Sequence, residues 1–203
     1  MVKQNKQQNK ISISDIIGYL AIILIVVSLF FIGMKVTGYV VVTDTAVVNV
    51  TVTTSAAINF TTDFINFGTG TVNATKVGAT VNTEGSVLNG TGFTVVSAPL
   101  VLQNIGNVNV SLNLSSSKSA ATFIGGTNPS FKVKVTDKSG ETGACITNGA
   151  VAYTELSTTN ISACGVFEFI DSRDEIDVDV QLFIPYNTEG AMTTIITATG
   201  TSA

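Results

Sequence analysis

Residues 176–184 read IDVDVQLFI, with an apolar side chain at every even position and a mostly polar one at every odd position. Successive side chains of a β-strand point to opposite faces, so this alternation predicts a strand with one buried and one solvated face. Antiparallel sheets that pack on one side only contain strands of this kind. We therefore expect residues 176–184 to form one strand of an antiparallel sheet.

Other parts of the chain repeat this alternation. It is clear in residues 39–53, 107–115 and 131–136, and weaker strand signals lie at 93–96, 100–103, 165–170 and 193–199. Turn signals that contain glycine separate them, such as Asn89-Gly90, Gly125-Gly126 and Glu189-Gly190. Seven or more short strands with regular turns predict an all-β fold, an antiparallel β-sandwich over residues 39–203.

The alternation also predicts which side chains share the core. These positions are Val40, Val42, Val48, Val50, Val108, Val110, Leu112, Leu114, Val133, Val135, Val178, Val180 and Leu182. On the opposite face, we expect Lys132 and Lys134 to lie across from Asp177 and Asp179 on a neighbouring strand.

A long apolar segment precedes the sandwich. Residues 16–34 contain no charged side chain, and as a helix these 19 residues would span about 28 Å, close to the hydrocarbon thickness of a bilayer. Ser12, Ser14 and Asp15 stand just before the segment, where they can cap a helix N-terminus. Residues 16–34 are therefore predicted to be a transmembrane helix that contacts membrane lipid.

Charge sets the predicted topology. Three lysines in residues 1–15 favour a cytoplasmic basic tail, so residues 35–38 become a short linker and residues 39–203 an extracellular domain of a single-pass plasma-membrane protein. The helix is either a retained signal-anchor or a cleaved signal peptide. A signal peptide usually has an apolar region of about 7–15 residues, which favours the retained anchor.

Composition excludes several activities. The chain has no histidine, which excludes Ser-His-Asp triads, Cys-His dyads and imidazole metal ligands. Residues 36–203 hold six basic and thirteen acidic side chains, and this acidic domain would repel a nucleic acid backbone. A glycosidase usually needs aromatic sugar platforms, whereas tryptophan is absent. We therefore expect no enzyme activity, no cofactor, no nucleic acid and no small-molecule substrate.

Two cysteines, Cys145 and Cys164, bracket 18 residues. In an exported domain such a pair is most simply a disulfide that closes a loop or hairpin. A metal or redox role would call for Cys-x-x-Cys spacing or histidine partners, and the sequence has neither.

Two further groups of residues are candidate sites. Seven asparagines stand in Asn-x-Ser/Thr glycosylation sequons: Asn49, Asn59, Asn73, Asn89, Asn109, Asn113 and Asn160. Asn49, Asn109 and Asn113 fall on the polar faces of predicted strands, where glycans would point outward. An acidic stretch in residues 168–179 contains the weak calcium candidates Asp171, Asp174 and Glu175, although their spacing is not that of a known calcium loop.

The end of the domain resembles a known family. Residues 182–185 (LFIP), 187–190 (NTEG) and 193–199 resemble the closing hairpin of immunoglobulin-like surface domains. Residues 100–114, with Asn104-Ile105-Gly106-Asn107, are similar to the strand-turn-strand of archaeal surface and archaellin-like sandwiches and of donor-strand filament proteins. These resemblances imply an immunoglobulin-like β-sandwich and carry no reactive group.

The N-terminus also resembles pilin and archaellin precursors, which have a basic leader before a long apolar helix. A leader ending after Lys10 would make Asp15 the fifth mature residue, where bacterial-type pilins carry a glutamate.

Three functions remain open from the sequence. The first is a membrane-anchored structural protein of the cell surface, such as a subunit of a surface filament or envelope layer. The alternatives are an adhesion or carbohydrate-binding module, and a pilin-like subunit with a cleaved leader. For self-association, residues 39–53 are either the first strand of their own domain or a strand that adds to a neighbour's sheet edge.

Overall fold

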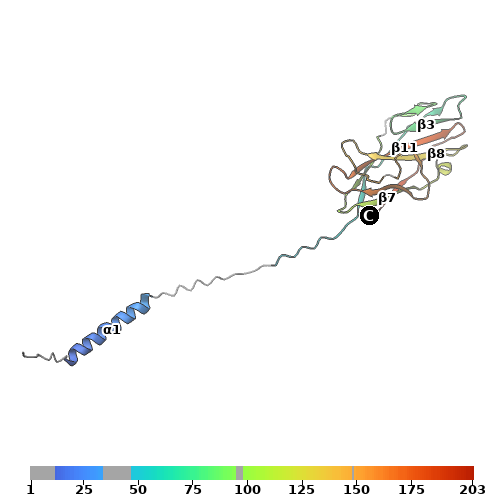
Figure 1. The fold of residues 1–203 in the computed structure, drawn as a ribbon. Helices are drawn as coiled ribbons and strands as arrows, with labels where there is room; N and C mark the ends of the chain where they lie inside the picture. Colours follow the sequence, from blue (N-terminus) through green and yellow to red (C-terminus); the bar gives the residue numbers. More distant parts are fainter. Residues whose placement is uncertain (1–11, 34–46, 95–97, 148) are drawn as a thin grey trace, which may run out of the picture. The chain divides into compact units, whose positions relative to one another are not determined.

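The computed structural model describes residues 12–33, 47–94, 98–147 and 149–203, and Figure 1 shows these parts in colour. The chain divides into two units, residues 1–50 and 51–203. Each unit is described by itself below.

The first unit contains helix α1 (Ile13–Gly33). Ser12 and Asp15 cap its N-terminus reciprocally: the Ser12 N–H donates to the Asp15 carboxylate at 3.1 Å, and the Ser12 carbonyl accepts from the N–H of Asp15 at 2.9 Å. The cap predicted from the sequence is therefore confirmed. The described side chains of α1, from residue 13 to 29, are all exposed. Among the described residues, no helix combines the length and the apolar character needed to cross a membrane.

The second unit is built from antiparallel strands. The larger sheet of the described residues contains β1 (Ile58–Thr62), β3 (Gly78–Asn82), β4 (Val87–Leu88), β6 (Leu100–Asn104), β8 (Ser130–Asp137), β9 (Thr154–Glu155) and β11 (Glu175–Pro185). The smaller sheet has the order β10-β7-β12, formed by β10 (Ile161–Phe167), β7 (Val110–Ser116) and β12 (Ile196–Ser202). A short ribbon pairs β2 (Thr71–Val72) with β5 (Gly90–Thr91), and helix α2 (Ala120–Phe123) follows β7.

Strand β11 organises the larger sheet. One of its edges pairs with β8 from Ile176 opposite Asp137 to Phe183 opposite Ser130. The other edge pairs first with β6 and then with β3. Because β11 is hydrogen-bonded on both edges, its even-numbered side chains are held in register over the core. The predicted strand at 176–184 is confirmed and lies within β11.

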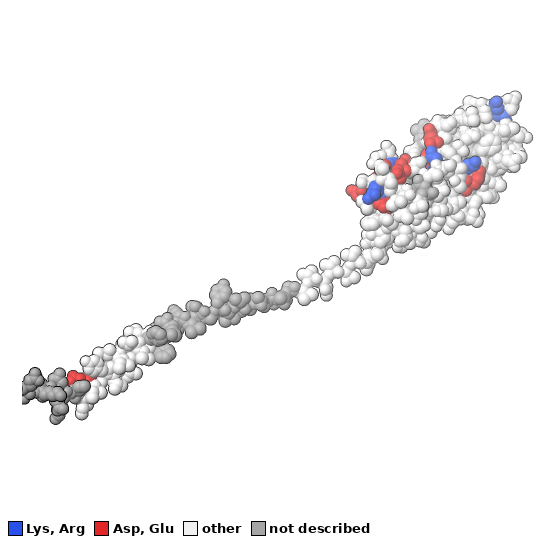
Figure 2. Space-filling model, in the orientation of Figure 1, with Lys and Arg blue, Asp and Glu red and all other residues white. Residues whose placement is uncertain are grey.

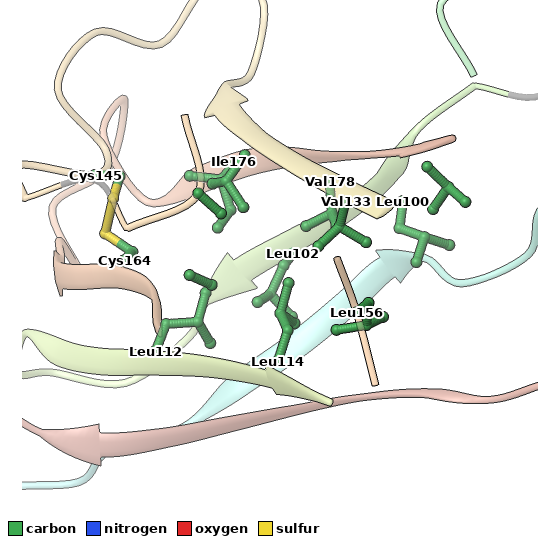
Figure 3. Close-up of a cluster of buried hydrophobic side chains, with 14 of the residues drawn as sticks. Leu100, Leu102, Leu112, Leu114, Val133, Cys145, Leu156, Cys164, Ile176 and Val178 are labelled. Atoms are coloured by element: carbon green, nitrogen blue, oxygen red, sulfur yellow. A yellow bond between two sulfur atoms is a disulfide. The ribbon is translucent and has the colours of Figure 1, made fainter. Parts of the chain in front are cut away.

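The two sheets pack face to face as a β-sandwich. Leu102, Val133 and Val178 of the larger sheet and Leu112 and Leu114 of the smaller sheet are all fully buried. Figure 3 shows the side chains of both sheets meeting in one cluster. Burying an aliphatic side chain of this size contributes about 1.5–3 kcal/mol, so this shared layer is the main source of stability.

The predicted core is confirmed at most positions and wrong at Val48 and Val50. Eight of the predicted positions are buried: Val110, Leu112, Leu114, Val133, Val135, Val178, Val180 and Leu182. Val108 is half-buried in the turn before β7. Val48 and Val50 are exposed, and residues 47–53 form no strand. Val40 and Val42 lie outside the described residues.

Several predicted strands change in extent. The segments at 107–115, 131–136 and 100–103 correspond to β7, β8 and β6, while those at 165–170 and 193–199 overlap only part of β10 and β12. The predicted closing hairpin is wrong, because β11 belongs to the larger sheet and β12 to the smaller one. The chain also passes from the larger sheet to the smaller one between β6 and β7.

Asn104 fastens the turn where the chain crosses from β6 to β7. Its side chain is almost fully buried, and its Nδ2 donates to the carbonyls of Val108 at 3.0 Å and Phe167 at 3.2 Å. Its Oδ1 accepts from the N–H of Gly106 at 3.1 Å. The amide therefore joins this turn to the end of β10 and satisfies buried backbone groups that water cannot reach.

We predict that Asn104→Ala lowers the free energy of unfolding by about 2 kcal/mol, because it leaves buried carbonyls without donors. Urea denaturation of the purified protein measures the change. The exposed Asn160→Ala is the control, with an expected change within about 0.5 kcal/mol. Equal effects of the two substitutions would refute the role given to Asn104.

Candidate functional site

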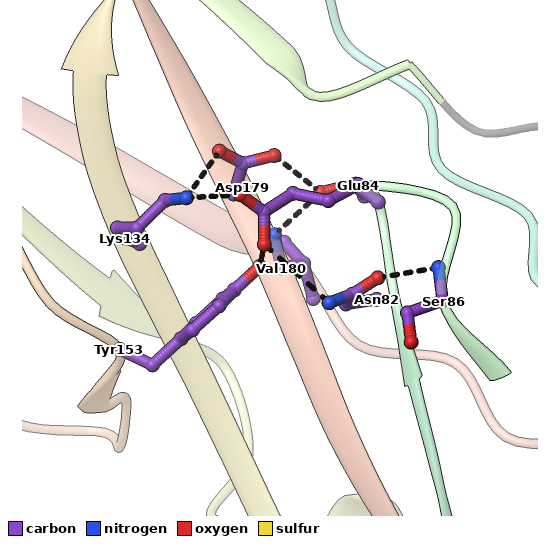
Figure 4. A network of polar contacts seen from close by, with 8 residues as sticks. Asn82, Glu84, Ser86, Lys134, Tyr153, Asp179 and Val180 are labelled. Carbon is purple, nitrogen blue, oxygen red and sulfur yellow. Dashed lines mark hydrogen bonds and ion pairs between the residues drawn. The ribbon is translucent and has the colours of Figure 1, made fainter. Parts of the chain in front are cut away.

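A network of charged and polar side chains lies on the face of the larger sheet away from the core. Lys134 on β8 stands directly opposite Asp179 on β11, and its Nζ lies 3.5 Å from the Asp179 Oδ2. The same Nζ donates to Glu84, which follows β3. Because β8 and β3 flank β11, their side chains converge over Asp179, as Figure 4 shows.

Tyr153 completes the cluster around Glu84. Its hydroxyl donates to the second Glu84 oxygen at 3.0 Å, and the Lys134 Nζ lies 5.2 Å from the centre of its ring. Asn82 Nδ2 also approaches that carboxylate oxygen, at 3.5 Å. One ammonium group thus faces two carboxylates, and neutral donors supply the remaining hydrogen bonds.

Asp179 is the buried member of the network. Its Oδ1 accepts from the Thr83 hydroxyl at 2.8 Å, and the same hydroxyl oxygen accepts from the N–H of Val180 at 3.0 Å. The Thr83 N–H in turn donates to the Val180 carbonyl at 3.0 Å. Thr83 therefore continues the β3–β11 pairing and at the same time compensates a carboxylate removed from water.

The electrostatics keep Glu84, Lys134 and Tyr153 in their ordinary charge states at neutral pH. Hydrogen bonds from Lys134 and Tyr153 lower the pKa of Glu84. Burial lowers the pKa of Lys134, but hydrogen bonds and charges from Glu84 and Asp179 outweigh burial and leave that pKa raised. Burial, followed by the bond to Glu84, raises the pKa of the Tyr153 phenol. These shifts stabilise a structural ion network, whereas a general acid or base is tuned toward neutral pH.

The predicted pairing across the strands is half right. Lys134 faces Asp179 as expected, but Lys132 stands opposite Gln181 and pairs instead with Glu155 on β9 at 3.6 Å. Asp177 stands opposite Thr136. The sequence analysis missed Glu84 and Tyr153, because both lie outside the alternating segments and only the sheet order brings them to β11. On the face visible in Figure 2, basic and acidic side chains lie next to each other.

The predicted disulfide is present. Cys145 and Cys164 are bonded, with their Cα atoms 5.7 Å apart. Cys164 lies on β10, while Cys145 lies in the loop after β8, where the Asp137 carboxylate accepts from the N–H of Gly143 at 2.7 Å and of Cys145 at 3.2 Å. The bond therefore attaches the loop after β8 to β10 of the smaller sheet. Closing a loop of this length contributes about 3 kcal/mol.

The calcium candidates are not gathered into a site. Among the described residues, no three carboxylate or cysteine side chains converge in a way that could hold a metal ion. Asp174 accepts from Gln103 Nε2 at 2.9 Å, and Glu175 accepts from Lys138 Nζ at 2.6 Å, while Asp171 is exposed. These three carboxylates therefore do not converge on a common point.

The sequon asparagines differ in accessibility. Asn49, Asn59, Asn73 and Asn160 are exposed. Asn89, Asn109 and Asn113 are half-buried, and Asn89 occupies a turn with a positive φ of 60°. Asn49 does not lie on a strand, contrary to expectation, and Asn109 precedes β7, while Asn113 lies on β7.

A second candidate site is an apolar groove between the sheets. It has a volume of about 720 Å³ and contains a single charged residue, Asp63. Its floor is formed by core side chains of β11 and its rim by residues 63–70 and 190–196. The aromatic part of the lining consists of phenylalanine side chains: Phe60, Phe64, Phe67, Phe93, Phe123 and Phe131. The groove suits an apolar occupant better than a sugar, which needs many convergent polar groups.

We predict that Lys134→Met lowers the free energy of unfolding at neutral pH by about 2–3 kcal/mol, because Asp179 would keep a buried charge without its cation. Lys132→Met is the matched control on the same strand. Its ion pair with Glu155 is more exposed, so the expected loss is below about 1 kcal/mol. Adding Asp179→Asn to Lys134→Met should recover part of the loss. Denaturant titration of the variants measures these differences, and a double variant less stable than the single one would contradict the assignment.

A second prediction concerns alkaline pH. The raised pKa of Tyr153 means that the folded protein keeps the phenol proton above about pH 10, where an unfolded tyrosine releases it, so this group makes the folded state lose stability as pH rises. Tyr153→Phe should therefore destabilise the protein at pH 7, through the lost hydrogen bond to Glu84, and destabilise it less at about pH 11. Unfolding curves at both pH values test this. Tyr186→Phe, at an exposed tyrosine, is the control substitution.

Comparison of the chain with protein-family models, with curated proteins and with solved structures finds no match.

Proposed function

We propose that the chain is a structural protein of the cell surface, with an extracellular β-sandwich attached to the membrane through residues 16–34. The disulfide is the observation that carries this proposal. Disulfides persist in oxidising compartments outside the cytosol, and this one joins the loop after β8 to β10. That chemistry supports an extracellular placement of the sandwich.

The membrane attachment is supported by the sequence and by the cap of α1. The uncharged segment ends at Met34, one residue beyond the described part of the helix. An apolar helix whose described side chains are all exposed has a surface that lipid can cover. The lysines of the first ten residues favour a cytoplasmic N-terminus.

The structural role is supported by how the charges of the sandwich are used. Lys134 forms ion pairs with both Glu84 and Asp179, and the pKa shifts of Lys134 and Glu84 favour their charged forms. The finer assignment to an immunoglobulin-like sandwich is supported by the two crossings between sheets, from β6 to β7 and from β11 to β12. The exposed sequon asparagines fit a glycosylated surface.

The test uses cells that express the full chain with a C-terminal tag. A protease added outside intact spheroplasts should remove the tag, and the protein should sediment with membranes after alkaline washing. Cys145 and Cys164 should resist a thiol-modifying reagent until a reductant is added.

Leu24→Arg with Val27→Arg should reduce membrane attachment, because arginine at the centre of a spanning helix costs about 2.5–3.5 kcal/mol per residue. Leu24→Phe with Val27→Leu is the apolar control. A protein that stays soluble, with reactive thiols and a protected tag, would refute the proposal. N-terminal sequencing separates a retained anchor from cleavage after Lys10 or after the apolar segment.

A further inference from the structure

Strand β12 is an open and regular edge of the smaller sheet. Among the described residues it pairs only with β7, and its register runs without a shift from Ile196 opposite Ser116 to Ser202 opposite Val110. The edges at β1 and β10 are different: β1 pairs with β6 through a shifted register, and residues 144–147 bond along β10. A regular edge without such protection is one to which another strand can add.

The backbone groups of β12 alternate between its two sides. The Ala203 N–H donates to the Asn109 carbonyl at 3.0 Å, and the Ser117 N–H donates to the Ile195 carbonyl at 2.8 Å, both in the register of the β7 pairing. Residues bonded to one neighbour alternate with unbonded ones in an antiparallel pair, so the odd-numbered residues of β12 bond to β7. The even-numbered residues therefore direct their N–H and C=O groups away from β7: Ile196, Ala198, Gly200 and Ser202.

The smaller sheet is also free of charge. Strands β7, β10 and β12 contain no lysine, arginine, aspartate or glutamate, and the outward face of β12 is a row of exposed threonines at 197, 199 and 201. Residues 36–203 hold six basic and thirteen acidic side chains, so two copies of the domain repel each other where their charges meet. The smaller sheet is therefore the surface at which a second copy can approach with little repulsion.

We propose that β12 pairs with β12 of a second copy, antiparallel and about a two-fold axis, so that the two smaller sheets form one continuous sheet. The register that overlaps the whole strand sets Ala198 opposite Gly200 of the second copy and Thr199 opposite Thr199 of the second copy. Even-numbered residues then form the hydrogen-bonded pairs, as their backbone directions require. The threonines meet in the non-hydrogen-bonded pairs, where side chains lie closest and threonine pairs are favourable.

The contact uses the same surface on both copies. Such a two-fold interface closes on itself, so the expected product is a dimer. The inference goes beyond the proposed function, because it identifies an interface and a partner and requires neither membrane attachment nor an oxidising compartment.

The first experiment removes one outward backbone donor. Proline has no N–H and is tolerated on an edge strand whose N–H faces solvent. Ala198→Pro should therefore keep the β7–β12 pairing and weaken dimerisation of the full-length protein in mild detergent by at least about tenfold. Ala198→Ser keeps the N–H and is the matched control. Size exclusion coupled to light scattering measures the dimer, and circular dichroism checks that both variants are folded.

The second experiment tests the register without proline. Thr199→Lys and Thr199→Glu each place like charges opposite each other at the axis, so each variant alone should dimerise at least about tenfold more weakly than the wild type. Mixing the two should restore the dimer, because opposite charges then meet. Thr197→Lys mixed with Thr197→Glu is the control. Residue 197 faces residue 201 of the second copy, so mixing this pair should give no gain over the separate variants.

The third experiment locates the axis by crosslinking. Thr199→Cys should give a disulfide-linked dimer on mild oxidation, because opposed Cα atoms of a non-hydrogen-bonded pair lie about 4.5 Å apart, within the span of a disulfide. Thr197→Cys alone should not, whereas a mixture of Thr197→Cys and Thr201→Cys should.

Several outcomes would overturn the inference. These are a monomeric wild type, an Ala198→Pro variant that dimerises as the wild type does, no recovery on mixing the two Thr199 variants, or equal crosslinking of the two single cysteine variants. Association through α1 alone would leave every variant unchanged and would overturn it too. None of these outcomes bears on membrane attachment or on the native disulfide, so the failure of this inference can be told apart from failure of the proposed function.

Discussion

The pairing of β11 with strands on both of its edges is the constraint on which the rest of the domain depends. Its register with β8 places Val178 and Val180 over the core and Asp179 on the opposite face. A slip of one residue would exchange the two faces, burying carboxylates among the leucines of β7. The same strand also determines which loops meet, because β3 and β8 can approach each other only across it.

The polar network and the disulfide both follow from that sheet order. Lys134 and Glu84 come from the strands on opposite sides of β11, and the Lys134 ammonium pairs with both Glu84 and Asp179. The loop after β8 is long enough to return to β10, where Cys145 meets Cys164. Hydrophobic burial therefore holds the sheets together, while these polar and covalent contacts select one arrangement of the strands around β11.

The two sides of the sandwich are closed to different degrees. At the β10 side, the disulfide and the backbone bonds of residues 144–147 cover the edge. At the β1 and β12 side, each of these two strands pairs on one edge only among the described residues, and the core extends into a groove whose lining includes several phenylalanines. The described strands therefore close the β10 side more fully than the β1 and β12 side.

The sequence alone determined the strands whose side chains alternate and the cysteine pair. In β7, β8 and β11, the period of two reflects a direct physical cause, since neighbouring side chains must point to opposite faces. Tertiary structure decided the rest. Residues 47–53 alternate as clearly as β11, yet their valines are exposed, because alternation shows only that a segment can form a strand and a partner edge must still be available. Glu84 and Tyr153 carry no local signal, and only the order of β3, β11 and β8 brings them to Lys134. The calcium candidates are close in sequence, but Asp174 bonds to Gln103 and Glu175 bonds to Lys138, so the carboxylates do not gather into one site.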